Sequence, residues 1–95
     1  MPVVYECDMT ITHKEFFRLL PKALAGLPYQ KNANQIRVTD GDSMIRITLA
    51  EESTRKLASL SLPMTQVHIE LDNVEEADMD RFISRFKLAY QKGGG

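Results

Sequence analysis

The sequence has little of the features that assign a protein to a class at once. Its 95 residues hold one cysteine and no tryptophan, and the formal net charge is -1. A single cysteine cannot form an internal disulfide, which suits a reducing compartment. The balanced charge argues against nucleic acid as the partner, because domains that bind nucleic acid usually carry a marked basic excess.

Long apolar runs are absent as well. The opening residues, MPVVYECDM, have no basic segment and no long apolar stretch, so they do not have the pattern of a signal peptide. No run approaches the roughly 20 apolar residues that a membrane span needs. We therefore expect a cytoplasmic protein with no membrane partner.

What the chain does have is the composition of a folded domain. Hydrophobic residues make up 43% of it and charged residues 26%, which favours a packed core over disorder. The length suits one domain with a core of its own. We predict a single globular domain over residues 1–92, followed by a glycine tail over residues 93–95.

Several stretches alternate between apolar and polar residues, as half-buried strands do. They are residues 3–9, the two runs within residues 35–49, and residues 65–71. This alternation places Cys7 on the core face of the first strand. The run TRKLASLSLP alternates less regularly, and we predict one more strand there, whereas KNAN has the composition of a loop.

Asp40 and Gly41, between two alternating runs, predict a two-residue type I′ hairpin turn, in which both central residues take positive φ. Such a turn would place Ile36 opposite Ile45 and make Arg37 and Arg46 diagonal neighbours on the polar face. The apolar residues of both runs then share the other face; they are Ile36, Val38, Ile45, Ile47 and Leu49.

Two amphipathic helices are predicted. Thr12 and Glu15 form a capping-box pattern that opens the first, Pro21 predicts a kink or a short second segment, and Gly26 fits a left-handed cap. The second spans residues 75–92. The apolar stripes that define the two helices are Phe16, Phe17, Leu19, Leu20, Ala23, Leu24 and Leu27, and then Met79, Phe82, Ile83, Phe86, Ala89 and Tyr90.

The predicted order is strand, helix, three or four strands, helix. We predict an α+β fold, a two-layer sandwich in which two helices cover one face of an antiparallel sheet of four to five strands. The neighbour relations of the strands do not follow from the sequence.

The residues that could carry catalysis do not form a known arrangement. A nucleophile needs a nearby base and an orienting group, but Cys7 points into the core, His13 stands at the first helical position and His68 faces outward from a strand. Neither Cys-x-x-Cys nor His-x-x-x-His spacing occurs, so no metal site is indicated. We predict that the protein is not an enzyme and holds no cofactor.

The polar face of the sheet is a better candidate for function. Arg37, Arg46 and His68 would give it a mildly basic binding surface. Proteins that bind single-stranded nucleic acid usually add aromatic side chains on which bases stack, and we place none on this face. We expect a protein partner there rather than nucleic acid, and the free edges of a small sheet allow a homodimer.

The chain ends in AYQKGGG, where Gly94 and Gly95 match the terminal Gly-Gly of a family of carriers. The tail resembles the ends of ubiquitin-like sulfur carriers of the thiamine and molybdopterin pathways, which implies a terminal carboxylate that is adenylated and then thiocarboxylated. Those carriers have a β-grasp order in which the tail leaves a strand, whereas here it follows a helix that Gly93 can cap. We expect a small non-catalytic interaction or accessory module, with a sulfur-carrier or ubiquitin-like protein as the alternative.

Overall fold

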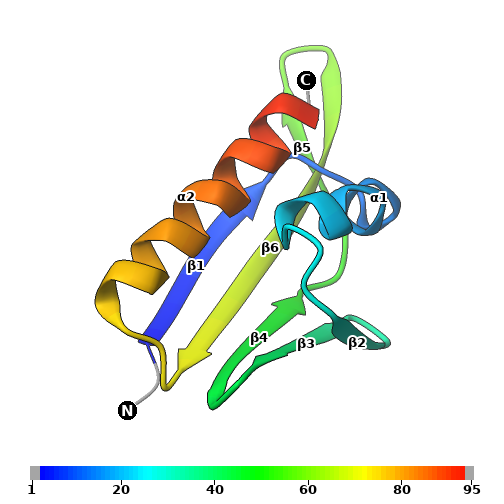
Figure 1. Cartoon of the computed structure of the whole chain (residues 1–95). Coiled ribbons are helices and arrows are strands. Elements are labelled where there is room, and N and C mark those ends of the chain that lie inside the picture. The colour runs from blue at the N-terminus through cyan, green and yellow to red at the C-terminus, as the bar shows by residue number, and fades with distance from the viewer. Residues whose placement is uncertain (1–2, 94–95) are drawn as a thin grey trace.

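Two helices lie over an antiparallel sheet in the computed structural model of the chain, which describes residues 3–93 (Figure 1). The elements are β1 (Val3–Met9), α1 (His13–Ala23), β2 (Tyr29–Asn32), β3 (Gln35–Asp40), β4 (Ser43–Leu49), β5 (Ser53–Leu57), β6 (Leu60–Asp72) and α2 (Glu76–Gly93). The predicted α+β fold is confirmed. The described part of the sheet has six strands, where four to five were predicted.

The long strand β6 pairs with three other strands of the sheet. The strand order is β1-β6-β4-β3-β2, and β5 also pairs with β6. On one side, β1 runs antiparallel to β6 from Val3 opposite Leu71 to Met9 opposite Thr65. On the other side, β4 pairs with the same half of β6. The first strand of the chain therefore lies at one edge of the sheet, next to the last strand.

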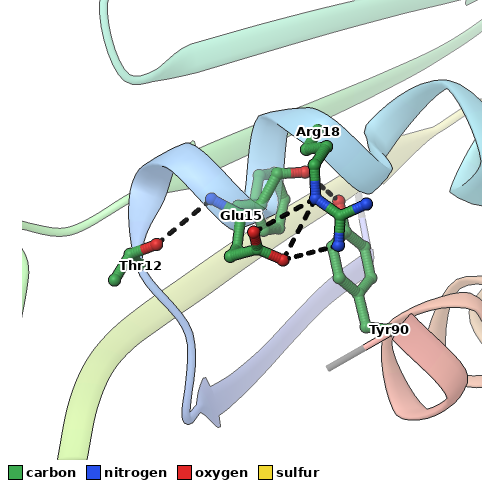
Figure 2. Close-up of polar contacts among 5 residues, drawn as sticks. Thr12, Glu15, Arg18 and Tyr90 are labelled. Carbon is green, nitrogen blue, oxygen red and sulfur yellow. Dashed lines mark hydrogen bonds and ion pairs between the residues drawn. The ribbon is translucent and has the colours of Figure 1, made fainter. Parts of the chain in front are cut away.

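The core lies between the helices and the inward face of the sheet. Phe16 of α1 and Tyr90 of α2 stack with their ring centroids 4.8 Å apart, and the Tyr90 hydroxyl donates to the Phe16 carbonyl at 2.8 Å (Figure 2). This contact joins the two helices. The sheet contributes the alternating apolar residues that the sequence predicts, and those buried are Ile36, Val38, Ile45, Ile47, Leu49, Val67, Ile69 and Leu71.

Helix α1 begins with half of the predicted capping box. The Thr12 hydroxyl accepts from the Glu15 amide at 3.1 Å, as expected for an N-cap. The Glu15 carboxylate, however, accepts from the Arg18 guanidinium at 2.7 Å instead of reaching back to the Thr12 amide (Figure 2). This hydrogen bond lowers the pKa of the Glu15 carboxyl. The helix start is as predicted, but an i,i+3 ion pair replaces the second bond of the box.

Pro21 does not divide the first helix, which runs as one element from His13 to Ala23. The chain leaves it through a left-handed turn in which the Gly26 amide donates to the Pro21 carbonyl at 3.1 Å. Gly26 has a φ of +82° and Ala25 a φ of +54°. The positive φ predicted for Gly26 is confirmed. Ala25 also has a positive φ, because the hydrogen bond from the Gly26 amide to the Pro21 carbonyl places Ala25 at the first position after the helix C-cap.

The predicted register of the β3–β4 hairpin is wrong by two residues. Ile36 lies opposite Ile47, and Arg37 lies directly opposite Arg46 instead of diagonal to it. The turn residues are Gly41 and Asp42, and Gly41 has a φ of +61°. A positive φ at the first central residue only is the type II′ pattern, which spares Asp40 the left-handed conformation. A shift of two preserves the faces, so the predicted core residues are unaffected.

The other corrections concern polar segments that form strands. Part of the predicted loop KNAN is the end of β2, which pairs antiparallel with β3, and Ala33 turns the chain with a φ of +56°. The predicted strand over residues 54–63 is instead a hairpin of β5 and the start of β6, with Ala58 in its turn at a φ of +55°. Pro63 lies within β6 rather than before it.

Helix α2 covers the sheet beside β1 (Figure 1). It runs from Glu76 to Gly93, one residue later at each end than predicted, and Gly93 is its last residue rather than a cap beyond it. In the described residues, neither α1 nor α2 combines the length and the apolar character that crossing a bilayer requires.

Candidate functional site

The polar face of the sheet, opposite the helices, holds the predicted binding residues in one cluster. Arg46 NH1 lies 3.7 Å from a Glu70 carboxylate oxygen. The other Glu70 oxygen lies 3.3 Å from His68 Nε2, and His68 Nδ1 lies 3.5 Å from Glu6. Adjacent strands bring these groups together, since Glu6 pairs with His68 and Arg46 with Glu70. Two carboxylates thus alternate with the predicted basic residues.

These ion pairs reduce the attraction of the polar face for charged partners. Arg46 and His68 are occupied by carboxylates of the same sheet, so the cluster of Arg37, Arg46, Glu6 and Glu70 has no net charge when His68 is neutral. Exposed ion pairs of this kind contribute little binding energy. The alternation of apolar and polar residues predicts outward positions for Glu6 and Glu70, but their pairing with the basic residues depends on the strand order.

The possible catalytic residues are not brought together. Cys7 pairs with Val67 and packs against the core, whereas His68 pairs with Glu6 on the polar face. His13 lies at the start of α1, where its Nε2 is 2.8 Å from the Ala50 carbonyl. Within residues 3–93, no three His, Cys, Asp or Glu side chains gather as metal ligands would. Among the described residues, Cys7, His13 and His68 therefore do not form a nucleophile with a neighbouring base.

A groove beside Cys7 separates β1 from the end of α2. It has a volume of about 410 Å³ and is lined by Tyr5, Cys7, Asp8, Met9, Thr10, Ile11, Phe86, Lys87, Tyr90 and Gln91. Burial raises the pKa of the Cys7 thiol, against the opposing effect of Lys87. A thiol with a raised pKa is a poor nucleophile at neutral pH. The Cys7 thiol therefore stays mostly protonated at neutral pH, which does not favour thiolate chemistry in this groove.

A second groove lies at the other end of β1, and we call it the Val3 groove. Its volume is about 630 Å³, and its lining residues are Val3, Val4, Tyr5, Leu71, Glu76, Met79, Asp80, Ile83 and Ser84. Val3 and Val4 are 45% and 50% exposed. Two acidic side chains of α2, Glu76 and Asp80, lie among these apolar residues. The Val3 groove is an apolar depression with an acidic rim.

The third surface is a projecting hairpin, which we call the arm and define as residues 53–64. It consists of β5, a turn at Ala58 and Ser59, and the first five residues of β6. It is the hairpin that extends past the α1 end of the sheet in Figure 1. Residues 65–71 of β6 pair with β1 and residues 67–72 with β4, whereas residues 60–64 pair only with β5.

The two faces of the arm differ in chemistry. Directly opposite residues share a face, and the pairs on one face are Leu57 with Leu60, Arg55 with Leu62, and Ser53 with Met64. The other face carries Thr54, Lys56, Ser61 and Pro63. Leu57 and Leu60 are 52% and 62% exposed. The arm therefore carries four apolar side chains and one arginine on one face, and the two leucines nearest the turn are exposed.

The sequence analysis missed this face. The alternation of Leu60, Leu62 and Met64 was the signal that could have found it. Leu57 and Ala58 interrupted the pattern only because the chain reverses direction there. The predicted tail residues Gly94 and Gly95 lie outside the described residues.

Comparison of the chain with models of protein families, with curated proteins and with solved structures gives no match in any of the three.

Proposed function

We propose that the protein is a small, non-catalytic cytoplasmic interaction module and that the arm is its docking element. The observation that carries this proposal is the uncovered apolar face of the arm. An isolated two-stranded hairpin is marginally stable in water, and this one exposes Leu57 and Leu60 at its tip without a helix above them. A partner surface that covers these leucines would bury apolar area and stabilise the hairpin.

The arm is built to dock by its face rather than by its edges. Pro63 has no amide hydrogen to offer a further strand, and Lys56 places a charge on the polar side of β5. Proline and lysine are common means of preventing edge-to-edge pairing. The recognition surface is therefore the set of Leu57, Leu60, Leu62 and Met64.

The chemistry of this face defines the partner. Four aliphatic side chains need an apolar surface, and Arg55 in their midst needs a carboxylate when it is desolvated. A nucleic acid would offer phosphates to Arg55 but no apolar surface for the leucines, and the arm has no aromatic residue on which bases could stack. An apolar protein surface with an acidic rim is the partner that the arm fits.

The test compares two double variants of the arm in the native host. Leu57→Ser with Leu60→Ser removes the apolar tip, whereas Thr54→Ala with Ser61→Ala changes the polar face of the same hairpin and serves as the matched control. Chemical cross-linking from Lys56, followed by mass spectrometry, identifies the bound partner. We expect the cross-link with the wild type and the control and its loss with the serine variant. Retention of the same cross-link by the serine variant would refute the proposal.

The same preparation distinguishes this module from a sulfur carrier. The intact mass of the isolated protein would show replacement of a carboxylate oxygen by sulfur, or a covalent conjugate through Gly95, if the tail is chemically activated. An unmodified terminus together with an arm-dependent cross-link supports the interaction module.

A further inference from the structure

The partner chemistry that the arm needs is present on the chain itself. The Val3 groove offers apolar side chains from β1 and α2, together with the carboxylates of Glu76 and Asp80. The arm offers four aliphatic side chains and the guanidinium of Arg55. Both the apolar character and the sign of the charge are therefore complementary between the two surfaces.

An arm cannot reach the groove of its own chain. Leu60 at the tip of the arm and Leu71 in the groove are 11 residues apart on the single strand β6, which corresponds to about 36 Å at the rise of an extended strand. The molecule is 47 Å long along its longest axis. In Figure 1, the arm lies at one end of the sheet, and the starts of β1 and α2 lie at the other. An arm that occupies the groove must therefore come from a second copy.

We propose that the arm of one copy docks into the Val3 groove of a second copy. This inference rests on the proposed function of the arm and names its partner. Leu57 and Leu60 cover Val3 and the apolar residues of α2, while Arg55 pairs with Glu76 or Asp80. Each copy supplies one arm and one groove, so the contact is head-to-tail, and it either closes into a ring or continues as a filament.

The charges of β1 favour this contact over the simpler pairing of two β1 edges. Glu6 and Asp8 lie on the polar side of β1 and are exposed. If two β1 edges paired antiparallel, these carboxylates would lie opposite those of the other copy, and opposed like charges destabilise a strand pair. Residues 53–64 contain Arg55 and Lys56 and no acidic residue. The arm therefore carries the charge opposite to that of the β1 edge, and no like charges oppose it.

A charge-swap experiment tests the contact. Arg55→Glu gives a chain in which the docking face of the arm and the groove both carry acidic residues, and Glu76→Arg with Asp80→Arg gives a chain in which both carry basic residues. Sedimentation velocity over a concentration series measures the self-association of the wild type, of each variant and of their equimolar mixture. Because Glu76 and Asp80 lie near the start of α2, circular dichroism first verifies folding, and Asp80→Arg alone serves as a milder variant.

We expect wild-type association that rises with concentration and weakens with salt, since partly exposed charge pairs are screened. Each variant alone should associate more weakly than the wild type by a factor of about ten at least, in line with the loss of a charge pair at an interface. The mixture should recover wild-type association, because each arm then meets a groove of opposite charge. Variants that associate like the wild type, or a mixture that does not recover, would overturn the proposal.

A wild type that stays monomeric up to about millimolar concentration, where weak contacts still register, would also overturn it. That result would leave the proposed function intact if the arm-dependent cross-link to a different protein persists. If the cross-link is absent as well, both proposals fail. The two experiments therefore separate the partner's identity from the role of the arm.

Discussion

The two halves of β6 belong to one strand, yet they lie in opposite environments. Val67 and Ile69 are fully buried beneath the helices and flanked by strands on both sides, whereas Leu60 is 62% exposed and has a single partner strand. Both halves are hydrogen-bonded to a neighbouring strand, and in both halves apolar and polar residues alternate. Leu60, Leu62 and Met64 also alternate out of step with Val67 and Ile69, so the strand places them on the face away from the helices. Backbone pairing therefore extends a strand in either environment, but only the apolar residues on the helix side become core.

The largest expected effect on stability comes from disrupting the helix core that covers residues 65–71 of β6. Phe16 is fully buried and stacks on Tyr90, so Phe16→Ala should lower the free energy of unfolding by about 3–5 kcal/mol, the usual cost of truncating a buried phenylalanine. Urea denaturation measures the change. Leu57→Ala on the arm is the control and should cost far less. A small change in the free energy of unfolding on Phe16→Ala would mean that the contacts of Phe16 contribute little to the stability of the fold.

The next prediction concerns the contact between the helices and its dependence on pH. Burial raises the pKa of Tyr90 above its ordinary value of 10.0. The unfolded chain loses this proton near pH 10 while the folded chain keeps it, so the stability of the wild type falls as pH rises above about 10. The slope should be about 1.4 kcal/mol per pH unit from this group.

Tyr90→Phe provides the control for that measurement. It removes the hydrogen bond to the Phe16 carbonyl and should cost about 1 kcal/mol at neutral pH. It should also remove the contribution of Tyr90 to the alkaline slope in urea titrations between about pH 9 and 11. If the wild type and the variant lose stability in parallel, Tyr90 does not keep its proton in the folded state.

A smaller effect is expected at the start of α1, at the border of the covered region. Thr12→Ala removes the side-chain acceptor of the Glu15 amide and should lower the free energy of unfolding by about 1 kcal/mol. Thr12→Ser retains the acceptor and should restore most of this stability. Thermal unfolding of the three proteins side by side measures the difference, and equal losses in both variants would disprove the cap.

The smallest effect on stability is expected at the arm. Leu57→Ser with Leu60→Ser changes two exposed residues and should alter the free energy of unfolding by less than about 0.5 kcal/mol each. Hydrogen exchange should be faster at residues 60–64 than at residues 65–71 of the same strand, since the first group lacks cover. Equal protection in a monomeric sample would show that the arm is stable without a partner.

The core could be predicted from the sequence because side-chain alternation survives errors of register. Ile36 and Ile47 are buried whichever turn residues are chosen, since a shift of two keeps each residue on its face. The helices were predictable for a similar reason. Phe16 and Phe86 belong to apolar stripes that helical spacing alone defines, and neither depends on the order of the strands.

The candidate site could not be predicted in the same way. Leu60 is an odd number of residues from Val67 and lies on the face of β6 away from the helices. Whether it is covered on that face depends on contacts that the sequence near Leu60 does not specify. The ion pairs of Glu6 with His68 and of Glu70 with Arg46 depend on β1 and β4 lying on either side of β6. These are relations between distant segments, and the strand order that creates them did not follow from the sequence.

The pairing of the first strand with the last also sets the order in which the chain can fold during synthesis. Val3 must wait for Leu71 to leave the ribosome before β1 has a neighbour, and pairing over so long a separation is slow. The hairpin of β5 and β6, by contrast, closes over a two-residue turn. We expect β1 to remain unpaired on the nascent chain, with Val3 and Val4 available to chaperones, until β6 has been synthesised.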